Sequence, residues 1–254
     1  MIKFFRHIRK SLINQNNMGK YFKYAIGEIL LVVIGILIAL QINNWNEARK
    51  TQAKEIEILN GFKNGLEFDI SQLDSISFHY ARARTSINII LEHLENDLSY
   101  SDSLAAHFFN STLIYDSGGL TDGVFETLKS VGFDMISNKE ILEQIILIYE
   151  EQNPWMQNWE TRYFDELFYA HNNLFKSRFK EFWKGDYKDP NVIGTMEPLN
   201  YEQLKTDNEF LYYLRTQKNF IGWLINKPVE NTGIECKKLL DLINEELKRL
   251  TIND

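Results

Sequence analysis

The sequence predicts an all-α protein, in which a single N-terminal transmembrane helix continues into a long helix packed with a helical-bundle domain outside the cytoplasm. An apolar run covers residues 25–42, and apolar residues then recur every seven positions as far as Leu94. The chain holds only 13 glycines and 4 prolines in 254 residues, which favours long helices over strands joined by tight turns. We therefore expect three parts: a basic cytoplasmic segment (1–24), a transmembrane helix (25–45) and an α-helical extracytoplasmic domain (46–254).

The apolar run, AIGEILLVVIGILIALQI, is long enough to cross a lipid bilayer. Its 18 residues make about 27 Å of helix, close to the thickness of the hydrocarbon layer. Tyr21, Phe22 and Tyr24 precede the run and Trp45 follows it, as in the aromatic belts that mark the two membrane interfaces. The lipid bilayer is therefore the first expected partner.

Positive charge gathers before this run. Residues 1–24 contain six lysines and arginines and no acidic residue, although the whole chain has a net charge of −7. Lysines and arginines beside the first membrane helix keep their side in the cytoplasm. The sequence therefore predicts a cytoplasmic N terminus and an acidic domain across the membrane. Such a domain is unsuited to nucleic acid, because phosphate contacts need clustered cations.

Residues 2–12 mix apolar and basic side chains. As a helix they would lie on anionic lipid at the inner surface, and as a disordered tail they would only orient the anchor; both interpretations stay open. A cleaved signal peptide fits less well, because the basic region is long, the apolar run exceeds a signal core and no Ala-x-Ala site follows.

Three residues of the run are candidate membrane contacts: Glu28, Gly35 and Ala39. A carboxylate inside a membrane often pairs with a partner's cation or carries a proton. Glu28 lies only three residues inside the run, about 4.5 Å along the helix axis, so contact with lipid headgroups is the favoured interpretation. Gly35 and Ala39 have the small-xxx-small spacing that lets two membrane helices approach, and self-association stays open.

The stretch EILLVVIGILIALQINNWNE (28–47) resembles the signature of a family of single-pass membrane proteins from Bacteroidota known only as a domain of unknown function, DUF6090. The segment LKSVGFDMISN (128–138) is similar to a second recurring segment of that family. The resemblance implies a protein of the bacterial inner (cytoplasmic) membrane with a periplasmic domain. It implies no activity and supplies no catalytic residues.

A stripe of apolar residues starts in the membrane run and continues beyond it. Its ten positions, seven residues apart, are Leu31, Ile38, Trp45, Gln52, Leu59, Leu66, Leu73, Tyr80, Ile87 and Leu94. A seven-residue period keeps one helix face turned toward a partner. Half of the neighbouring seam is polar or glycine, and Lys63 and Arg84 would face like charges across a symmetric coiled coil. We therefore expect the stripe beyond Ile56 to pack on helices of its own chain, with any self-association confined to the membrane segment.

The other helices are predicted from apolar periodicity and end signals. Thr121 or Asp122 is the expected cap of one helix and Asn138 of another, and Pro154 begins a helix that runs to about Trp183. A turn is expected at residues 116–119 and the longest loop at 184–200. The expected helices span 46–94, 104–110, 123–130, a stretch after 138, 154–183, 208–226 and 229–250.

Motifs of catalysis are missing from the sequence. It contains no Gly-x-Ser-x-Gly elbow, phosphate loop or dinucleotide fingerprint. No two of the five histidines are four residues apart, and none follows a glutamate by three. The single cysteine, Cys236, excludes thiolate metal sites and an internal disulfide. We therefore expect no cofactor, no metal and no enzymatic activity.

Residues 155–183 contain ten aromatic side chains. One interpretation is an aromatic-lined ligand pocket that includes Trp155, Trp159, Tyr163 and His171. The favoured interpretation is a bulky core stripe, because these aromatics recur at helical spacing.

Three functions are compatible with these observations. The favoured one is an envelope interaction or scaffold protein whose domain binds another envelope protein. The alternatives are an extracytoplasmic ligand-sensing bundle and an enzyme whose site is not visible in the sequence. Sensing would require a partner, because a cytoplasmic segment of about 24 residues is too short to fold as an output domain.

Overall fold

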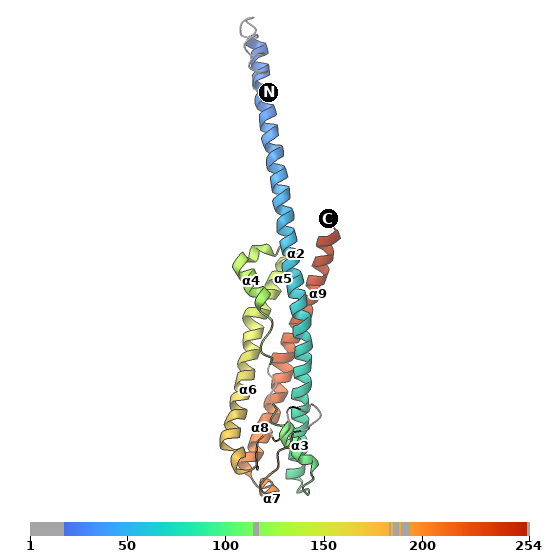
Figure 1. The fold of residues 1–254 in the computed structure, drawn as a ribbon, viewed down its shortest axis with the longest axis vertical. Coiled ribbons are helices and arrows are strands. Elements are labelled where there is room, and N and C mark those ends of the chain that lie inside the picture. The colour runs from blue at the N-terminus through green and yellow to red at the C-terminus, as the bar shows by residue number, and fades with distance from the viewer. Residues whose placement is uncertain (1–17, 114–116, 183, 185–187, 189–193, 253–254) are drawn as a thin grey trace. The chain divides into compact units, whose positions relative to one another are not determined.

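The computed structural model describes residues 18–113, 117–182, 184, 188 and 194–252. Helices make up 83% of the chain, and no strand occurs in the described ranges (Figure 1). The all-α prediction is therefore confirmed. The chain divides into two compact units, Met1–Lys54 and Glu55–Asp254.

Helix α2 (Met18–Glu95) is one α-helix of 78 residues that contributes to both units. In the first unit its apolar residues face outward, and none of its most apolar 18-residue window is buried. By length and composition this helix is a candidate membrane span, and the described residues contain one such helix. Helix α2 ends at Glu95, as predicted, and Asp97 just beyond it has a positive φ of 54°. The surface helix considered for residues 2–12 lies outside the described residues.

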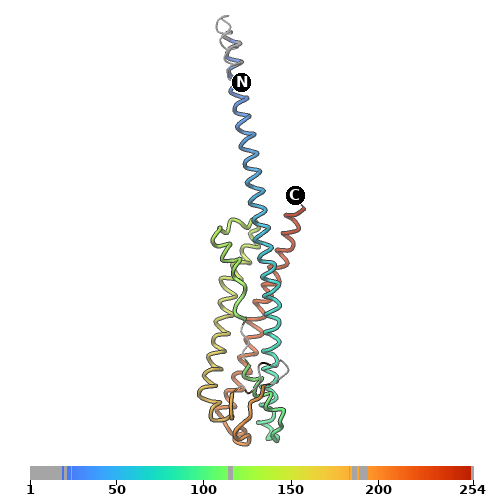
Figure 2. The backbone as a smooth tube through the Cα atoms, in the orientation of Figure 1, coloured from blue at the N-terminus to red at the C-terminus, as the bar shows by residue number. Residues whose placement is uncertain are grey.

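Among the described residues, the second unit is built mainly from three long helical rods. Figures 1 and 2 show these rods lying side by side. The first rod is the part of α2 that begins at Glu55. The other two each join two α-helices through a short π-helical turn: α5 (Lys139–Ile146), η2 (Leu147–Gln152) and α6 (Asn153–Asn173), then α8 (Asn208–Leu224), η4 (Ile225–Val229) and α9 (Glu230–Ile252).

Paired aromatic rings give the relative direction of the first two rods. The ring centroids of Phe62 and Tyr149 are 5.7 Å apart, and those of Tyr80 and Tyr163 are 5.5 Å apart. Residue numbers therefore increase in the same direction along α2 and along the rod that contains α6. These two rods are parallel.

Ion pairs show that the third rod runs the opposite way. Arg215 of α8 lies 2.8 Å from Glu95, and Lys237 of α9 lies 3.4 Å from Asp74, so residue numbers decrease as α2 advances. Because the first two rods are parallel, the connection between them must return along the bundle. That connection carries α3 (Ser103–Asn110), α4 (Gly123–Val131) and η1 (Phe133–Met135), and a short helix α7 (Tyr201–Leu204) precedes α8.

The stripe residues of the second unit lie at the centre of its core. Six successive members are only 0–3% exposed: Leu59, Leu66, Leu73, Tyr80, Ile87 and Leu94. They belong to one cluster with residues of the other two rods, which confirms that this part of the stripe packs on its own chain. Burying one such leucine contributes about 1.5–3 kcal/mol to folding.

Each π-helical turn adjoins or contains a proline. Proline lacks a backbone N–H, and in an α-helix its ring crowds the carbonyl group four residues back. A π turn bonds across five residues and widens the helix locally. The N–H of the residue after each turn donates to a carbonyl five residues back, Asn153 to Ile148 and Glu230 to Ile225. The chain thus remains helical through Pro154 and Pro228, and the predicted break between residues 226 and 229 is wrong.

The predicted end of the helix at Trp183 is also wrong. Helix α6 ends at Asn173 and is followed by the 3₁₀ turn η3 (Phe175–Ser177). Phe179 then forms an isolated bridge with Pro198, which requires extended backbone. Trp183 itself lies outside the described residues. Periodicity did not reveal this end, because the aromatic residues continue past it.

Buried carboxylates hold the connection against α2. Asp69 accepts hydrogen bonds from the backbone N–H and the hydroxyl of Thr121, at 3.1 and 2.7 Å. Glu55 accepts from the backbone N–H and the hydroxyl of Ser137, at 2.7 and 2.8 Å. The hydroxyl of Thr121 is therefore used in a tertiary contact, and Asp122 at the N-cap makes no side-chain capping bond. Neither residue caps α4 as predicted.

Other local predictions, for a helix cap and a turn, agree with the structure. The side chain of Asn138 accepts hydrogen bonds from the backbone at the start of α5, so this predicted cap is confirmed. The expected turn contains Gly118 and Gly119 with φ of 64° and 80°, while Asp116 lies outside the described residues. At Gly61 an added Cβ would lie 3.0 Å from Val124, so this glycine admits α4 closely against α2.

Candidate functional site

Three of the four residues proposed for an aromatic pocket lie where helices pack. The rings of Trp155 and Trp159 are 5.9 and 4.2 Å from the ring of Trp223 on the third rod. Tyr163 is buried edge-on against Tyr80, and burial raises the pKa of its hydroxyl. These three aromatics therefore form the contact between rods.

His171 lies apart from them on the same helix. It is 12 residues beyond Trp159, about 18 Å along the axis. Its ring is 4.0 Å from that of Phe182, and it lines a separate hollow of about 220 Å³ with Phe175 and Phe179. The four residues do not line one common hollow within the described structure.

The candidate membrane contacts all lie on the outward-facing part of α2. Glu28 lies in a shallow surface hollow among apolar side chains of the same helix. A Cβ added at Gly35 would have no atom within 4 Å, and Ala39 is exposed. Gly35 and Ala39 are therefore uncovered by the described residues of this unit, whereas Glu28 is half-buried.

A groove between α6 and α8 is a stronger candidate site, and sequence reasoning missed it. The hollow has a volume of about 210 Å³. Its lining residues come from these two helices and the segment just after α6: Glu166, Tyr169, Ala170, Asn173, Leu174, Glu209, Tyr212, Tyr213, Thr216 and Gln217. The rim is aromatic, because Tyr169 and Tyr212 are 67% and 70% exposed. Tyr169 and Tyr212 occupy helix positions outside the buried apolar stripes. Aromatic residues at such positions are the sequence signal that could have predicted the groove.

Two lining residues of α8 also bury polar atoms that have no partner among the described residues. The Tyr213 hydroxyl and the Gln217 side-chain oxygen are shielded from solvent and make no hydrogen bond to the described residues. Four residues apart on α8, they lie on the same helix face. Burying such a group unpaired costs about 1–3 kcal/mol. The pKa of Tyr213 is raised by burial and by nearby Tyr163 and Glu166.

The fixed charge of the lining is negative. It contains Glu166 and Glu209 but no lysine, arginine or histidine. Arg178, which lies outside the lining, donates to Glu209 at 2.6 Å. The Glu209 side chain remains mostly exposed, so its charge is only partly balanced.

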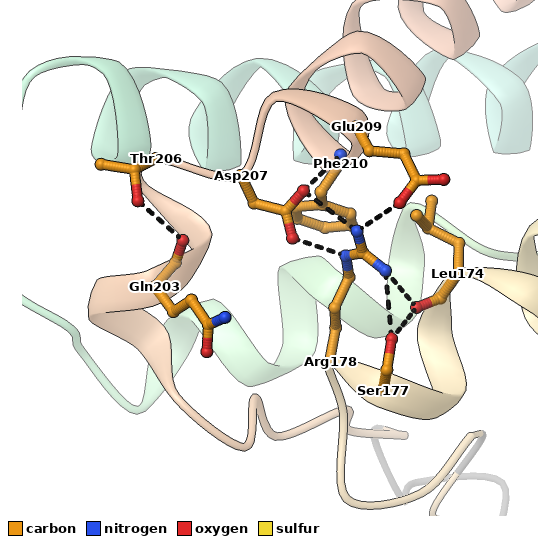
Figure 3. Close-up of polar contacts among 8 residues, drawn as sticks. All are labelled: Leu174, Ser177, Arg178, Gln203, Thr206, Asp207, Glu209 and Phe210. Carbon is orange, nitrogen blue, oxygen red and sulfur yellow. Dashed lines mark hydrogen bonds and ion pairs between the residues drawn. The ribbon is translucent and has the colours of Figure 1, made fainter.

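Arg178 contacts the groove residues Leu174 and Glu209, and Figure 3 shows the polar contacts of its guanidinium. Its guanidinium donates to the Asp207 carboxylate at 2.7 and 3.0 Å and to the Leu174 carbonyl at 2.9 Å. Asp207 also accepts from the Phe210 N–H at 3.0 Å and so caps α8. Burial opposes ionisation of Asp207, but the hydrogen bonds and charge of Arg178 outweigh it and lower its pKa. The guanidinium thereby joins the end of α6 to the beginning of α8.

Other reactive groups are poorly placed for chemistry. Cys236 is fully buried, and burial raises the pKa of its thiol to about 12, which keeps it protonated at neutral pH. No cluster of three or more metal-ligating side chains occurs among the described residues.

These features define a helical-bundle protein with one candidate membrane helix. Residues 28–114 match the model of a family of unknown function, DUF6090, which confirms the resemblance found in the sequence. The match covers the first resembling segment and ends before the second, at 128–138, and before the α6–α8 groove. The comparisons with curated proteins and with solved structures gave no match.

Proposed function

We propose that this chain is a membrane-anchored interaction protein of the bacterial envelope, and that the groove between α6 and α8 binds another envelope protein. In this proposal the N terminus is cytoplasmic and the helical domain is periplasmic. The basic residues before the apolar run, with no acidic residue among them, support that orientation.

The observation that carries the binding function is the exposed aromatic rim of this groove. Tyr169 and Tyr212 expose most of their surface there, on the two sides of one hollow. Exposed apolar surface beside a hollow is typical of binding sites. A bound partner would cover the two rings, and tyrosine is among the residues that most often dominate binding energy.

The groups in the groove suit binding better than catalysis. Its hydroxyls are those of tyrosines and Thr216, and no histidine or lysine lines it to accept a proton from them. The elevated pKa of Tyr213 further disfavours its ionised form. A hollow of about 210 Å³ also favours a second candidate, a ligand-sensing bundle that acts through a partner.

Site-specific photocrosslinking in native membranes tests the proposal. A photoreactive amino acid at Tyr212 should capture one defined envelope protein, whereas the same probe at Phe78, an exposed residue of α2 outside the groove, should not. Identical adducts from both positions would contradict a groove-specific partner. A reporter fused after Asp254 should be active only outside the cytoplasm, and cytoplasmic activity would overturn the orientation.

A further inference from the structure

We infer that helix α3 is held on α2 by a contact that mild acid weakens, through protonation of His107. The inference does not depend on the proposed binding function, because it concerns a different part of the bundle. Three observations lead to it: the position of His107 between two helices, the positive charge that faces it on α2, and the pairing of the nearby carboxylates with other cations.

His107 lies where α3 meets α2. Its Nδ1 atom is 3.1 Å from the hydroxyl of Ser86, a buried residue of α2. The histidine itself is half-buried, while Leu104 and Phe108 on the same short helix are each only 1% exposed. Helix α3 therefore docks by an apolar face, and its polar contact with α2 is made by a side chain that titrates near neutral pH.

The α2 surface around Ser86 carries positive charge. Arg82 lies four residues before Ser86 and His93 seven residues after it, so the three share one helix face. Both are close enough to oppose a positive charge on His107. The Nδ1 atom of His93 is shielded from solvent and makes no hydrogen bond to a described residue, so one edge of this ring is already buried.

The described carboxylates at this end of the bundle are mostly paired with other cations. The ion pairs are Glu95 with Arg215, Asp97 with Lys205, Glu197 with Lys180 and Glu209 with Arg178. Glu92 and Asp102 are exposed, and neither affects the pKa of His107. Among the described residues, the charges that act on His107 are therefore the two positive ones on α2.

These surroundings give protonation a definite effect. A protonated ring donates at both nitrogens, so its bond to Ser86 can persist with the serine oxygen as acceptor. The cost of protonation comes instead from burial and from His93 and Arg82, which together lower the pKa of His107. The stability contributed by His107 is fully present above its ordinary pKa of about 6.5 and is lost as pH falls through the folded-state value.

Helix α3 also supports two segments that are distant in the sequence. The Phe108 ring is 5.1 Å from that of Phe179 and 6.3 Å from that of Phe210, in the first turn of α8. The Met196 N–H donates to the Ala105 carbonyl at 2.9 Å. A weaker α3 contact should therefore loosen this end of the bundle first.

Hydrogen exchange of full-length protein in detergent micelles, followed by mass spectrometry at pH 7.5 and 5.5, tests this inference. After correction for the intrinsic pH dependence of exchange, the amides of α3 should become about three- to tenfold less protected at pH 5.5. The amides of α5, near the opposite end of the bundle in Figure 1, should change by less than about twofold.

Variants assign the effect to His107 and its neighbours. His107→Gln keeps a hydrogen-bonding side chain that cannot become charged, so its α3 amides should lose no extra protection in acid. Arg82 is exposed, so Arg82→Gln leaves the core intact, and removal of its charge should make the acid response smaller than in wild type. The matched control His171→Gln removes a histidine of α6 that does not act on His107, and it should retain the full response.

Two results would overturn the inference. One is an equal acid response of α3 in wild type and His107→Gln. The other is an equal loss of protection in α3 and α5, which would indicate unfolding of the whole bundle. If His107→Gln does not fold, Arg82→Gln decides alone: a full wild-type response in that variant would contradict the role of positive charge on α2.

Discussion

The two parts of α2 contain the same seven-residue apolar stripe, but the stripe is exposed in one part and buried in the other. Leu31 in the candidate membrane span is 64% exposed, whereas Leu66 in the bundle is completely buried. The helix type, the period and even the residue type are the same at these two positions. A heptad stripe therefore does not by itself determine whether a helix face packs on its own chain.

The residues between the stripe positions explain the difference. Around Leu31 the neighbours are apolar on nearly every side, as Ile29, Leu30 and Val32 illustrate, with Glu28 the one charged exception. A helix that is apolar all round is suited to lipid or to a fully enclosed core. Around Leu66 the neighbours include exposed Asn64 and Glu67, so only one face needs cover. The amphipathic part folds against its own chain.

The largest expected effect comes from shortening a stripe residue on the covered side. Leu66→Ala should lower the free energy of unfolding of the bundle by about 2–5 kcal/mol, because a cavity replaces a fully buried side chain. Leu31→Ala should change it by less than about 0.5 kcal/mol, since this side chain is mostly exposed. Chemical unfolding of full-length protein in detergent, followed by tryptophan fluorescence, measures both. Equal losses would remove the distinction between the two parts.

A second pair of variants adds volume instead of removing it. Gly61→Leu should destabilise the bundle by about 1–3 kcal/mol, because even a Cβ at this position would lie 3.0 Å from Val124. Gly35→Leu meets no neighbouring atom within 4 Å of its Cβ and should leave bundle stability within about 0.5 kcal/mol of wild type. The same unfolding assay compares them. Tolerance of leucine at Gly61 would show that α4 is not held against α2.

The smallest expected effect is a pH dependence of the free energy of unfolding that comes from buried carboxylates, and Asp69 of α2 is the first case. Burial raises the pKa of Asp69, although hydrogen bonds from Thr121 act in the opposite sense. The folded state therefore holds this proton more tightly than the unfolded state, where the pKa is about 3.9. The resulting stability is fully present below about pH 3.9 and is lost as pH rises through the folded-state pKa.

Asp207 has a pKa shift of the opposite sign, so the same measurement of stability against pH should show the opposite trend. Its folded-state pKa is lowered, so its contribution is present above about pH 3.9 and is lost as pH falls through the folded-state value. The stability of wild type relative to Asp69→Asn should therefore decrease as pH rises, and relative to Asp207→Asn it should increase. Unfolding free energies between pH 3 and 8 give both slopes. Two curves of the same sign would contradict this assignment.

Only part of the candidate site could be predicted from the sequence. The aromatic-rich segment drew attention to α6, which contributes Tyr169 to the groove. The opposite wall comes from Tyr212, Tyr213 and Gln217 of α8, more than 40 residues further along the chain. No local pattern connects these residues with α6. Their proximity follows from the antiparallel packing of the two helices.

The sequence by itself determined the features that depend on neighbours along the chain. The apolar run, the stripe from Leu59 to Leu94, the cap at Asn138 and the all-α class all follow from residues a few positions apart, because helix geometry brings such residues together. The family resemblance likewise came from two continuous stretches, 28–47 and 128–138, of which the family match covers the first.

Tertiary structure decided the features that depend on distant partners. Thr121 resembled a helix cap, yet its hydroxyl bonds to Asp69, 52 residues away. Pro228 resembled a helix end, yet a π turn packed in the bundle carries the helix past it. In both cases the alternative local conformations differ in free energy by only about 1–3 kcal/mol. Packing and hydrogen bonds from elsewhere in the fold readily exceed this difference. The parallel course of α2 and α6, and the groove beside α8, are set by those same long-range contacts.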